Sequence, residues 1–199
     1  QPSMMSASER LKLGKYTSLL KMVMEAGDEG QLSRQAYAKY SEMLRDISHL
    51  LPCWAVTSLS ARGRIPLEPG YFDLVVFDEA SQCDIASALP LLYRGKSVVI
   101  IGDPNQLSHI SGLQRGQDQA LLERFQLLAE FPHWAYSHQS LYGLGSTQVS
   151  GGDVVGLVDH HRSHADIINF SNEEFYEERL RVATKYDNLR SPNPSEPGI

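Results

Sequence analysis

The sequence predicts an α/β fold, in which a parallel sheet is flanked by helices and preceded by an N-terminal helical hairpin. Two short apolar runs, FDLVVF (72–77) and SVVII (97–101), are rich in β-branched residues and do not alternate with polar ones. Strands that are covered on both faces in a parallel sheet have this pattern. Residues 85–95 between them suit a crossover helix despite Pro90, which gives a strand–helix–strand unit.

The predicted hairpin occupies residues 1–51. Ser8 can cap a helix over 8–26, which Gly27 can end, and a second helix is predicted over 33–51 with Pro52 just beyond it. The turn-like link GDEGQ is short, so we expect the two helices to run antiparallel.

The later elements are predicted from shorter patterns. The sequence indicates a loop over 62–70, a helix over 118–130, a loop over 140–153 and a helix from about Ser163 to Arg179. Strands are predicted at 53–59 and 154–161.

Composition restricts the function classes. The 199 residues are 42% hydrophobic and carry a net charge of −6, so any nucleic-acid binding has to use a local basic patch. Cys53 and Cys83 give neither a disulfide framework nor a four-ligand zinc site. They fit a reducing compartment, so we expect a cytoplasmic protein. No apolar run approaches the ~20 residues that span a bilayer, and no membrane partner is expected.

Polar residues follow both apolar runs at their carboxyl ends. Asp78 and Glu79 come directly after the first run, and the second leads into GDPNQL (102–107), which contains Asp103 and Gln106. Ligands of open α/β sheets bind beyond the carboxyl ends of the strands, so these four side chains are expected on one edge.

This set suits nucleotide hydrolysis. One carboxylate can hold Mg²⁺ through its waters, a second can activate the attacking water, and an amide can contact the γ-phosphate. Each pattern alone has a simpler explanation: Asp78-Glu79 can be a solvated strand end, and GDPNQ is a good turn sequence.

Taken together, the motifs resemble those of superfamily 1 helicases. VVFDEASQ (75–82) resembles their motif II, VVIIGDPNQL (98–107) their motif III, and residues 157–180 their motif IV region; WAVTSLSAR (54–62) resembles the nucleic-acid-contacting segment before motif II. The nearest branch holds the RNA-decay and Okazaki-fragment-processing helicases, and the resemblance covers about residues 52–182.

The resemblance implies a partial RecA-like parallel sheet. Residues 1–51 would be a helical appendage, 52–150 the C-terminal half of a first RecA-like domain, and 151–199 the start of a second with a frayed C-terminus.

The family also implies roles for single residues. Asp78 would bind Mg²⁺ and Glu79 would be the catalytic base. Gln106 would contact the γ-phosphate, and Arg162 would be the arginine finger. Gln82 would couple the nucleotide site to its surroundings.

Further implied contacts complete this picture. Asp103 belongs with the cofactor-binding set for ATP and Mg²⁺, and Thr57 and Ser58 would hydrogen-bond a nucleic-acid backbone. The implied partners are single-stranded nucleic acid, with DNA favoured over RNA, and the remaining lobes of the parent helicase. Open sheet edges would also allow self-association of this chain.

Two departures from the family pattern matter. The motif IV region reads His160-His161-Arg162-Ser163-His164-Ala165, which lacks the Gln, Tyr and Pro of the commoner pattern. His160 and His164 are also spaced i, i+4, so a zinc site is an alternative interpretation of this segment.

The second departure is that no G-x-x-x-x-G-K-[ST] phosphate loop occurs in the chain. Gly14-Lys15 lies within the first predicted helix, and motifs V and VI do not follow residue 182. We therefore expect a middle section of a helicase that is inactive alone. Two alternatives are a non-catalytic interaction or nucleic-acid module built on a helicase-derived sheet, and an ordinary α/β domain whose acids are structural.

Overall fold

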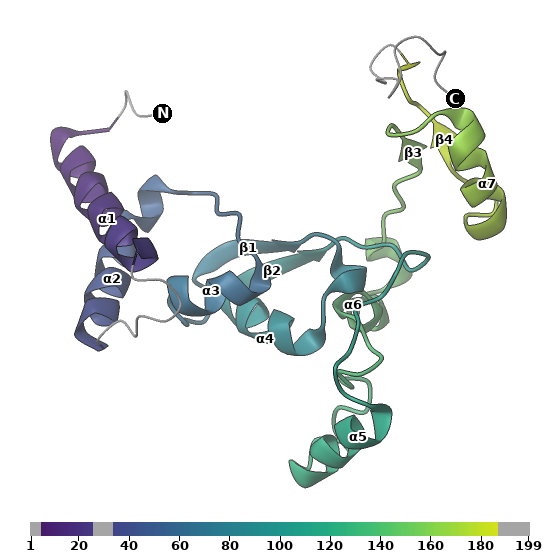
Figure 1. Cartoon of the computed structure of the whole chain (residues 1–199), viewed down its shortest axis with the longest axis horizontal. Helices are drawn as coiled ribbons and strands as arrows, with labels where there is room; N and C mark the ends of the chain where they lie inside the picture. The colour runs from purple at the N-terminus through teal and green to yellow at the C-terminus, as the bar shows by residue number, and fades with distance from the viewer. Residues whose placement is uncertain (1–4, 26–33, 187–199) are drawn as a thin grey trace. The chain divides into compact units, whose positions relative to one another are not determined.

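The computed structural model describes residues 5–25 and 34–186 of the chain (Figure 1). The helices and strands follow one another as α1 (Ala7–Glu25), α2 (Arg34–Ile47), η2 (Ser48–Leu50), α3 (Ser58–Arg64), β1 (Phe72–Phe77), η3 (Ala80–Gln82), α4 (Ile85–Arg94), β2 (Gly95–Ile100), α5 (Arg115–Arg124), α6 (Leu141–Gln148), η4 (Gly151–Asp153), β3 (Asp159–His160), α7 (Ala165–Phe175) and β4 (Arg181–Val182). This mixture of helices with small parallel sheets confirms the predicted α/β class.

The chain divides into two compact units. The first unit contains residues up to 76 together with 86–99, and the second contains residues 77–85 together with those from 100 onward. No helix in the described ranges is long and apolar enough to cross a membrane.

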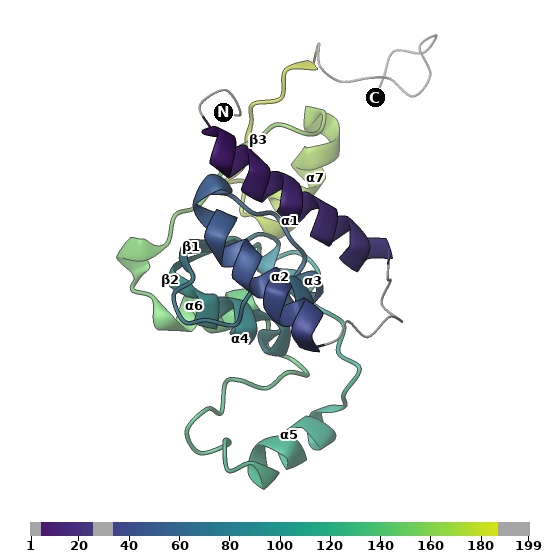
Figure 2. The same cartoon turned by 90° about the vertical axis from the view of Figure 1, so that its left-hand side faces the viewer.

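The helical hairpin belongs to the first unit. Helices α1 and α2 lie side by side in both views (Figures 1 and 2). Tyr16 and Tyr40 stack with ring centroids 5.7 Å apart, and their hydroxyls lie 3.2 Å from each other. His49, just after α2, lies 3.9 Å from Glu9 at the start of α1, so the helices are antiparallel as predicted. The predicted link GDEGQ lies outside the described residues.

The hairpin is stabilised by a small apolar cluster. Tyr40, Leu44 and Ile47 project from one face of α2 at helical spacing and are buried against Tyr16. The tyrosine rings bury apolar area while one hydroxyl donates a hydrogen bond to the other. The segment around Gly14-Lys15 is regular helix, as its sequence predicts.

Strands β1 and β2 pair in one two-stranded sheet. Lys96 Nζ lies 2.7 Å from Asp73 Oδ1 near the strand starts, and the Ile101 amide donates to the Phe77 carbonyl at the strand ends. Because start meets start and end meets end, the strands run parallel, with α4 as the predicted crossover.

The faces of this sheet are less covered than expected. Leu74 and Val76 on β1 are 51% and 53% exposed, and Val98 on β2 is 45% exposed. The prediction that both faces are covered is therefore wrong for the described chain, because helices do not enclose the two strands on both sides.

A buried arginine joins α4 to the segment before β1. Arg94 is only 2% exposed; its guanidinium donates to the carbonyls of Ile65, Pro66 and Pro90 at 2.8, 2.9 and 2.6 Å. A buried charge of this kind is tolerated only when hydrogen bonds replace the lost water.

A second strand–helix–strand unit closes the described chain. Strands β3 and β4 pair in parallel, with Asp159 opposite Arg181 and His160 opposite Val182, and α7 connects them. The strand predicted at 154–161 shrinks to its last residues, and β4 was not predicted because a two-residue strand carries no apolar run.

Other predicted elements are wrong or displaced. Residues 53–57 form no strand, because Thr57 caps α3 by accepting from the Ser60 amide at 3.3 Å. The loop predicted at 140–153 contains α6, which Ser140 caps in the same way. The helix predicted at 118–130 is α5, which begins and ends earlier.

Candidate functional site

The carboxyl ends of β1 and β2 meet in the second unit. The amide of Ile101 donates to the carbonyl of Phe77 at 2.8 Å, and the amide of Ala80 donates back to the carbonyl of Ile101 at 2.8 Å. The loops that follow the two strands therefore leave the sheet at the same edge. This confirms the predicted juxtaposition of the two strand ends.

Ser81 fastens the two loops to each other. Its side chain donates to the carbonyl of Asp103 and accepts from the amide of Asp103, both at 2.7 Å, and Ser81 is 4% exposed. Gly102 permits this approach: a Cβ there would lie 2.8 Å from Ser81 Oγ and 2.7 Å from Tyr142 Cδ2. The motif II resemblance includes Ser81, within residues 75–82, but assigned it no role.

Asp78 and Glu79 present exposed carboxylates at this edge. Asp78 Oδ1 accepts from the Glu79 amide at 3.0 Å, and Glu79 has left-handed backbone angles, φ 53° and ψ 39°. Within the described ranges, no cationic side chain pairs with either carboxylate. A non-glycine residue in this region is strained, and such strain is typical of functional sites.

Carboxylate oxygens with open coordination fit a hydrated Mg²⁺, which keeps several waters and takes one or two protein ligands. Asp78 could hold the ion and Glu79 could orient a water. The chain supplies no glycine-rich loop for a triphosphate, so its own residues fit only the metal and water side of such a site.

Asp103 is the most connected residue of the edge. Its Oδ2 accepts from Tyr176 Oη at 2.6 Å and from Gln106 Nε2 at 2.9 Å, and its Oδ1 accepts from the Asn105 amide at 3.0 Å. Burial raises the pKa of the Asp103 carboxyl, but these hydrogen bonds outweigh it and lower that pKa below its ordinary value. Asp103 is therefore an anchored carboxylate, unlike Asp78.

Gln106 and Gln82 are both exposed. Gln106 is tied back to the Asp103 carboxylate and has an exposed amide, as a phosphate-contacting group requires. Gln82 ends η3, and its backbone amide donates to the Glu79 carbonyl at 2.9 Å. Gln82 thus supports the strained turn at Glu79.

Arg162 lies exposed in the loop between β3 and α7, and its guanidinium makes no hydrogen bond or ion pair with the described part of the chain. The histidines around it have structural partners. His160 Nε2 accepts from the Ser163 amide at 2.9 Å, His161 Nδ1 lies 3.2 Å from the Ala183 carbonyl, and His164 caps α7. No cluster of three or more His, Cys, Asp or Glu suited to a metal occurs among residues 5–25 and 34–186.

Thr57 and Ser58 lie at the start of α3, in the first unit. The Thr57 hydroxyl donates to Ser60 Oγ at 2.9 Å and caps the helix. A nucleic-acid backbone that bonds the Thr57 hydroxyl would therefore compete with these two bonds at the start of α3, because the hydroxyl already donates one bond and accepts another.

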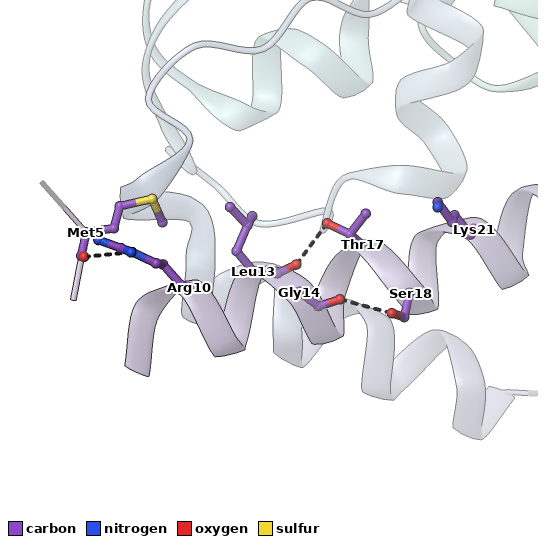
Figure 3. A pocket seen from close by; sticks show the side chains of 7 residues that line it. All are labelled: Met5, Arg10, Leu13, Gly14, Thr17, Ser18 and Lys21. Atoms are coloured by element: carbon purple, nitrogen blue, oxygen red, sulfur yellow. Dashed lines mark hydrogen bonds between the residues drawn. The ribbon is translucent and has the colours of Figure 1, made fainter. Parts of the chain in front are cut away.

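Two hollows of the described surface lie away from these residues. A groove of about 480 Å³ runs along α1 and is lined by Met5, Arg10, Leu13, Gly14, Thr17, Ser18 and Lys21 (Figure 3). The Thr17 and Ser18 hydroxyls there donate to carbonyls of their own helix. A second hollow of about 230 Å³ lies beside Phe131 and Trp134. Neither hollow contains a predicted site residue.

Comparisons with known proteins bear on this site. The family model described as an AAA domain matches residues 17–110. An uncharacterized ATP-dependent helicase of Mycoplasma genitalium is 30% identical over 151 residues, which cover 75% of this chain and 13% of that protein.

Two eukaryotic proteins are also similar to this chain. The probable helicase senataxin of Homo sapiens is 26% identical over 155 residues (72% of this chain, 5% of that protein), and the helicase SEN1 of Saccharomyces cerevisiae is 34% identical over 123 residues (59% and 4%). The chain thus spans 4% to 13% of the length of these three relatives.

Proposed function

Because this chain belongs to the superfamily 1 helicases, we propose that it supplies part of the ATP-hydrolysing site of an ATP-dependent nucleic-acid helicase. The observation that carries the proposal is the meeting of the two strand ends, where the Ile101 amide bonds the Phe77 carbonyl. That bond gathers two exposed carboxylates and an amide side chain at one edge.

Each residue has a chemical task in this proposal. Asp78 holds Mg²⁺, and Glu79 takes a proton from the attacking water. Gln106 contacts the γ-phosphate, Asp103 anchors the Gln106 loop and Gln82 supports the Glu79 turn. Mg²⁺ supplies charge neutralisation for the phosphates when it is bound.

Arg162 has the separate task of stabilising transition-state charge. Its guanidinium is exposed and unpaired within the described residues, so it is available to a phosphate. In the intact protein, Arg162→Ala should lower kcat of ATP hydrolysis by about 10³-fold or more while ATP binding changes little. The matched control is Arg124→Ala on α5, which should leave both unchanged, and a parallel loss of binding and turnover would contradict the role.

The second substrate of the proposal is single-stranded nucleic acid, bound through its phosphodiester backbone by Thr57 and Ser58. Stimulation of ATP hydrolysis by oligodeoxynucleotides and by oligoribonucleotides of the same sequence tests this, with DNA expected to act more strongly. The nucleic-acid part of the proposal would be contradicted if neither DNA nor RNA stimulated ATP hydrolysis. Full stimulation of the double variant Thr57→Val, Ser58→Ala would contradict the role of these two residues.

The 199-residue chain alone is expected to bind ATP poorly and not to hydrolyse it, because it has no phosphate loop. Turnover by this chain that vanishes in Glu79→Gln would overturn that expectation.

The exposed strand residues lead to a proposal about partners. Leu74 and Val76 on β1 and Val99 on β2 form an apolar face that the remaining lobes of the parent helicase would cover. In their absence we expect copies of this chain to associate, so sedimentation should show a concentration-dependent dimer or larger species. A monomer at all concentrations would count against it.

A further inference from the structure

We propose that Tyr176 is a positioning residue whose hydroxyl holds the Asp103 carboxylate and thereby sets the loop that carries Gln106. The inference rests on the proposed function and extends it to a residue of the motif IV region, 157–180, to which the resemblance assigned no role. It assigns α7 a direct mechanical connection to the nucleotide site.

The contact joins segments 73 residues apart. Tyr176 Oη donates to Asp103 Oδ2 at 2.6 Å, a short bond of the charge-assisted kind. A second bond reinforces it, from Asn105 Nδ2 to the Phe175 carbonyl at 2.7 Å. Two residues of the loop, on either side of Pro104, thus engage two adjacent residues at the end of α7.

Tyr176 is presented from a well-supported turn. Its amide donates to the carbonyl of Asn172, and the Asn172 side chain, 9% exposed, bonds both the amide and the carbonyl of Leu180 at 2.9 and 3.0 Å. The buried amide therefore fixes the path of the chain on both sides of Tyr176, so movement of α7 would move the hydroxyl with it.

The acceptor atom explains why this matters for Gln106. Asp103 Oδ2 accepts from both Tyr176 and Gln106. If Gln106 turns toward a phosphate, the oxygen keeps one strong donor, because Tyr176 remains in place. Tyr176 therefore lowers the free-energy cost of moving Gln106 away from Asp103. Without the Tyr176 hydroxyl, the same movement would leave the half-buried Asp103 Oδ2 with neither of its two donors.

The two partners belong to the same compact unit, yet they fall on opposite sides of the predicted domain boundary near residue 150. In the proposed helicase the bond therefore links the first RecA-like domain to the second. Closure or opening of the domains would then make or break the support of Gln106.

The first test needs no activity. In the 199-residue chain labelled with ¹³Cζ-tyrosine, the Tyr176 resonance, assigned by its absence from Tyr176→Phe, should shift when Asp103 is changed to Asn. The matched control is Tyr186, whose hydroxyl has no hydrogen-bond partner in the described part of the chain and whose resonance should not move. An unmoved Tyr176 resonance would overturn the proposal.

The second test uses the intact protein. Tyr176→Phe should lower kcat of nucleic-acid-stimulated ATP hydrolysis by about tenfold, the effect of one charge-assisted hydrogen bond, with little change in KM for ATP. Asp103→Asn should have a similar effect, and the double variant should lose little more. Tyr186→Phe should match wild type.

The outcomes separate the two proposals. Wild-type kcat in Tyr176→Phe, or fully additive losses in the double variant, would overturn the positioning role while leaving the proposed function intact. Absence of any ATP hydrolysis in the wild-type intact protein would defeat the proposed function and this role together, although the chemical-shift response would still demonstrate the bond.

Discussion

Ser81 and Asp103 are joined by a pair of hydrogen bonds, in which the serine side chain both donates to the aspartate carbonyl and accepts from the aspartate amide at 2.7 Å. The pair binds the loop after β1 to the loop after β2 through the Ser81 hydroxyl and backbone atoms of Asp103, so it does not depend on the charge of any carboxylate. It leaves the Asp103 side chain free to bond Tyr176 and Gln106.

Close packing around this pair predicts the effect of a single methyl group. Gly102→Ala would place Cβ 2.7 Å from Tyr142 Cδ2 and 2.8 Å from Ser81 Oγ, so the loops must separate. We expect a loss of about 1–3 kcal/mol in the free energy of unfolding, measured by urea denaturation.

The matched control, Gly116→Ala, should change the free energy of unfolding in the opposite direction. Gly116 lies in α5, and a Cβ there would meet nothing within 4 Å. Gly116→Ala should therefore stabilise by roughly 0.5–1 kcal/mol through helix propensity. Equal effects of the two alanines would contradict the account of the junction.

The left-handed backbone of Glu79 predicts a conflict between stability and function. Glu79→Gly should raise the free energy of unfolding by about 0.5–1 kcal/mol, because glycine adopts φ 53° without steric cost. Glu79→Gln keeps the strain and should leave stability unchanged in the same denaturation series. A destabilised glycine variant would show that the side chain, rather than the backbone, governs this turn.

Buried Arg94, which is not part of the candidate site, predicts a large effect on stability. Arg94→Met removes the donors to the carbonyls of Ile65, Pro66 and Pro90, and should cost about 2–4 kcal/mol of unfolding free energy by urea denaturation. Arg45→Met breaks an exposed ion pair with Glu68 and should cost at most about 1 kcal/mol. Similar losses in both variants would contradict a specific structural role for Arg94.

The Asp103–Tyr176 bond predicts a pH dependence with two limits. The pKa of the Asp103 carboxyl is lowered in the folded protein. The stability that the ionised carboxylate contributes is therefore present above the ordinary carboxyl pKa and is lost as the pH falls through the pKa in the folded protein. The bond to Asp103, with partial burial, raises the pKa of Tyr176 to about 12, so the contribution of Tyr176 is present below its ordinary value near 10 and is lost between there and about 12.

Denaturation of wild type and Tyr176→Phe at several pH values checks this. The difference in unfolding free energy should be constant from neutral pH to about pH 10 and should shrink above it. The Tyr186→Phe variant should show no such change, because no hydroxyl bond of Tyr186 occurs within the described chain. A constant wild-type to Tyr176→Phe difference up to pH 12 would argue against the bond.

The sequence predicted the core of the candidate site because the signals there are local. An apolar β-branched run followed at once by acidic residues identifies a strand and its carboxyl end, and two such runs around a helix require a parallel pair. Strand β1 and helix α4 therefore appear almost where their residues predict them.

The missed features depend on non-local contacts. Thr57 and Ser140 cap helices inside segments whose apolar and glycine residues suggested a strand and a loop. The importance of Tyr176 depends on a partner 73 residues away. Covered strand faces were predicted from apolar composition, but coverage depends on which elements pack there, and Leu74 remains 51% exposed.

The central proposal is that the edge formed by the ends of β1 and β2 supplies the carboxylates with which the intact protein hydrolyses ATP. The most direct measurement is the steady-state rate of nucleic-acid-stimulated ATP hydrolysis by the intact protein, compared between wild type, Glu79→Gln and the control Glu173→Gln on exposed α7. The account predicts a loss of about 10²–10⁴-fold in Glu79→Gln and wild-type activity in the control. A Glu79→Gln protein that hydrolyses ATP at the wild-type rate would contradict it.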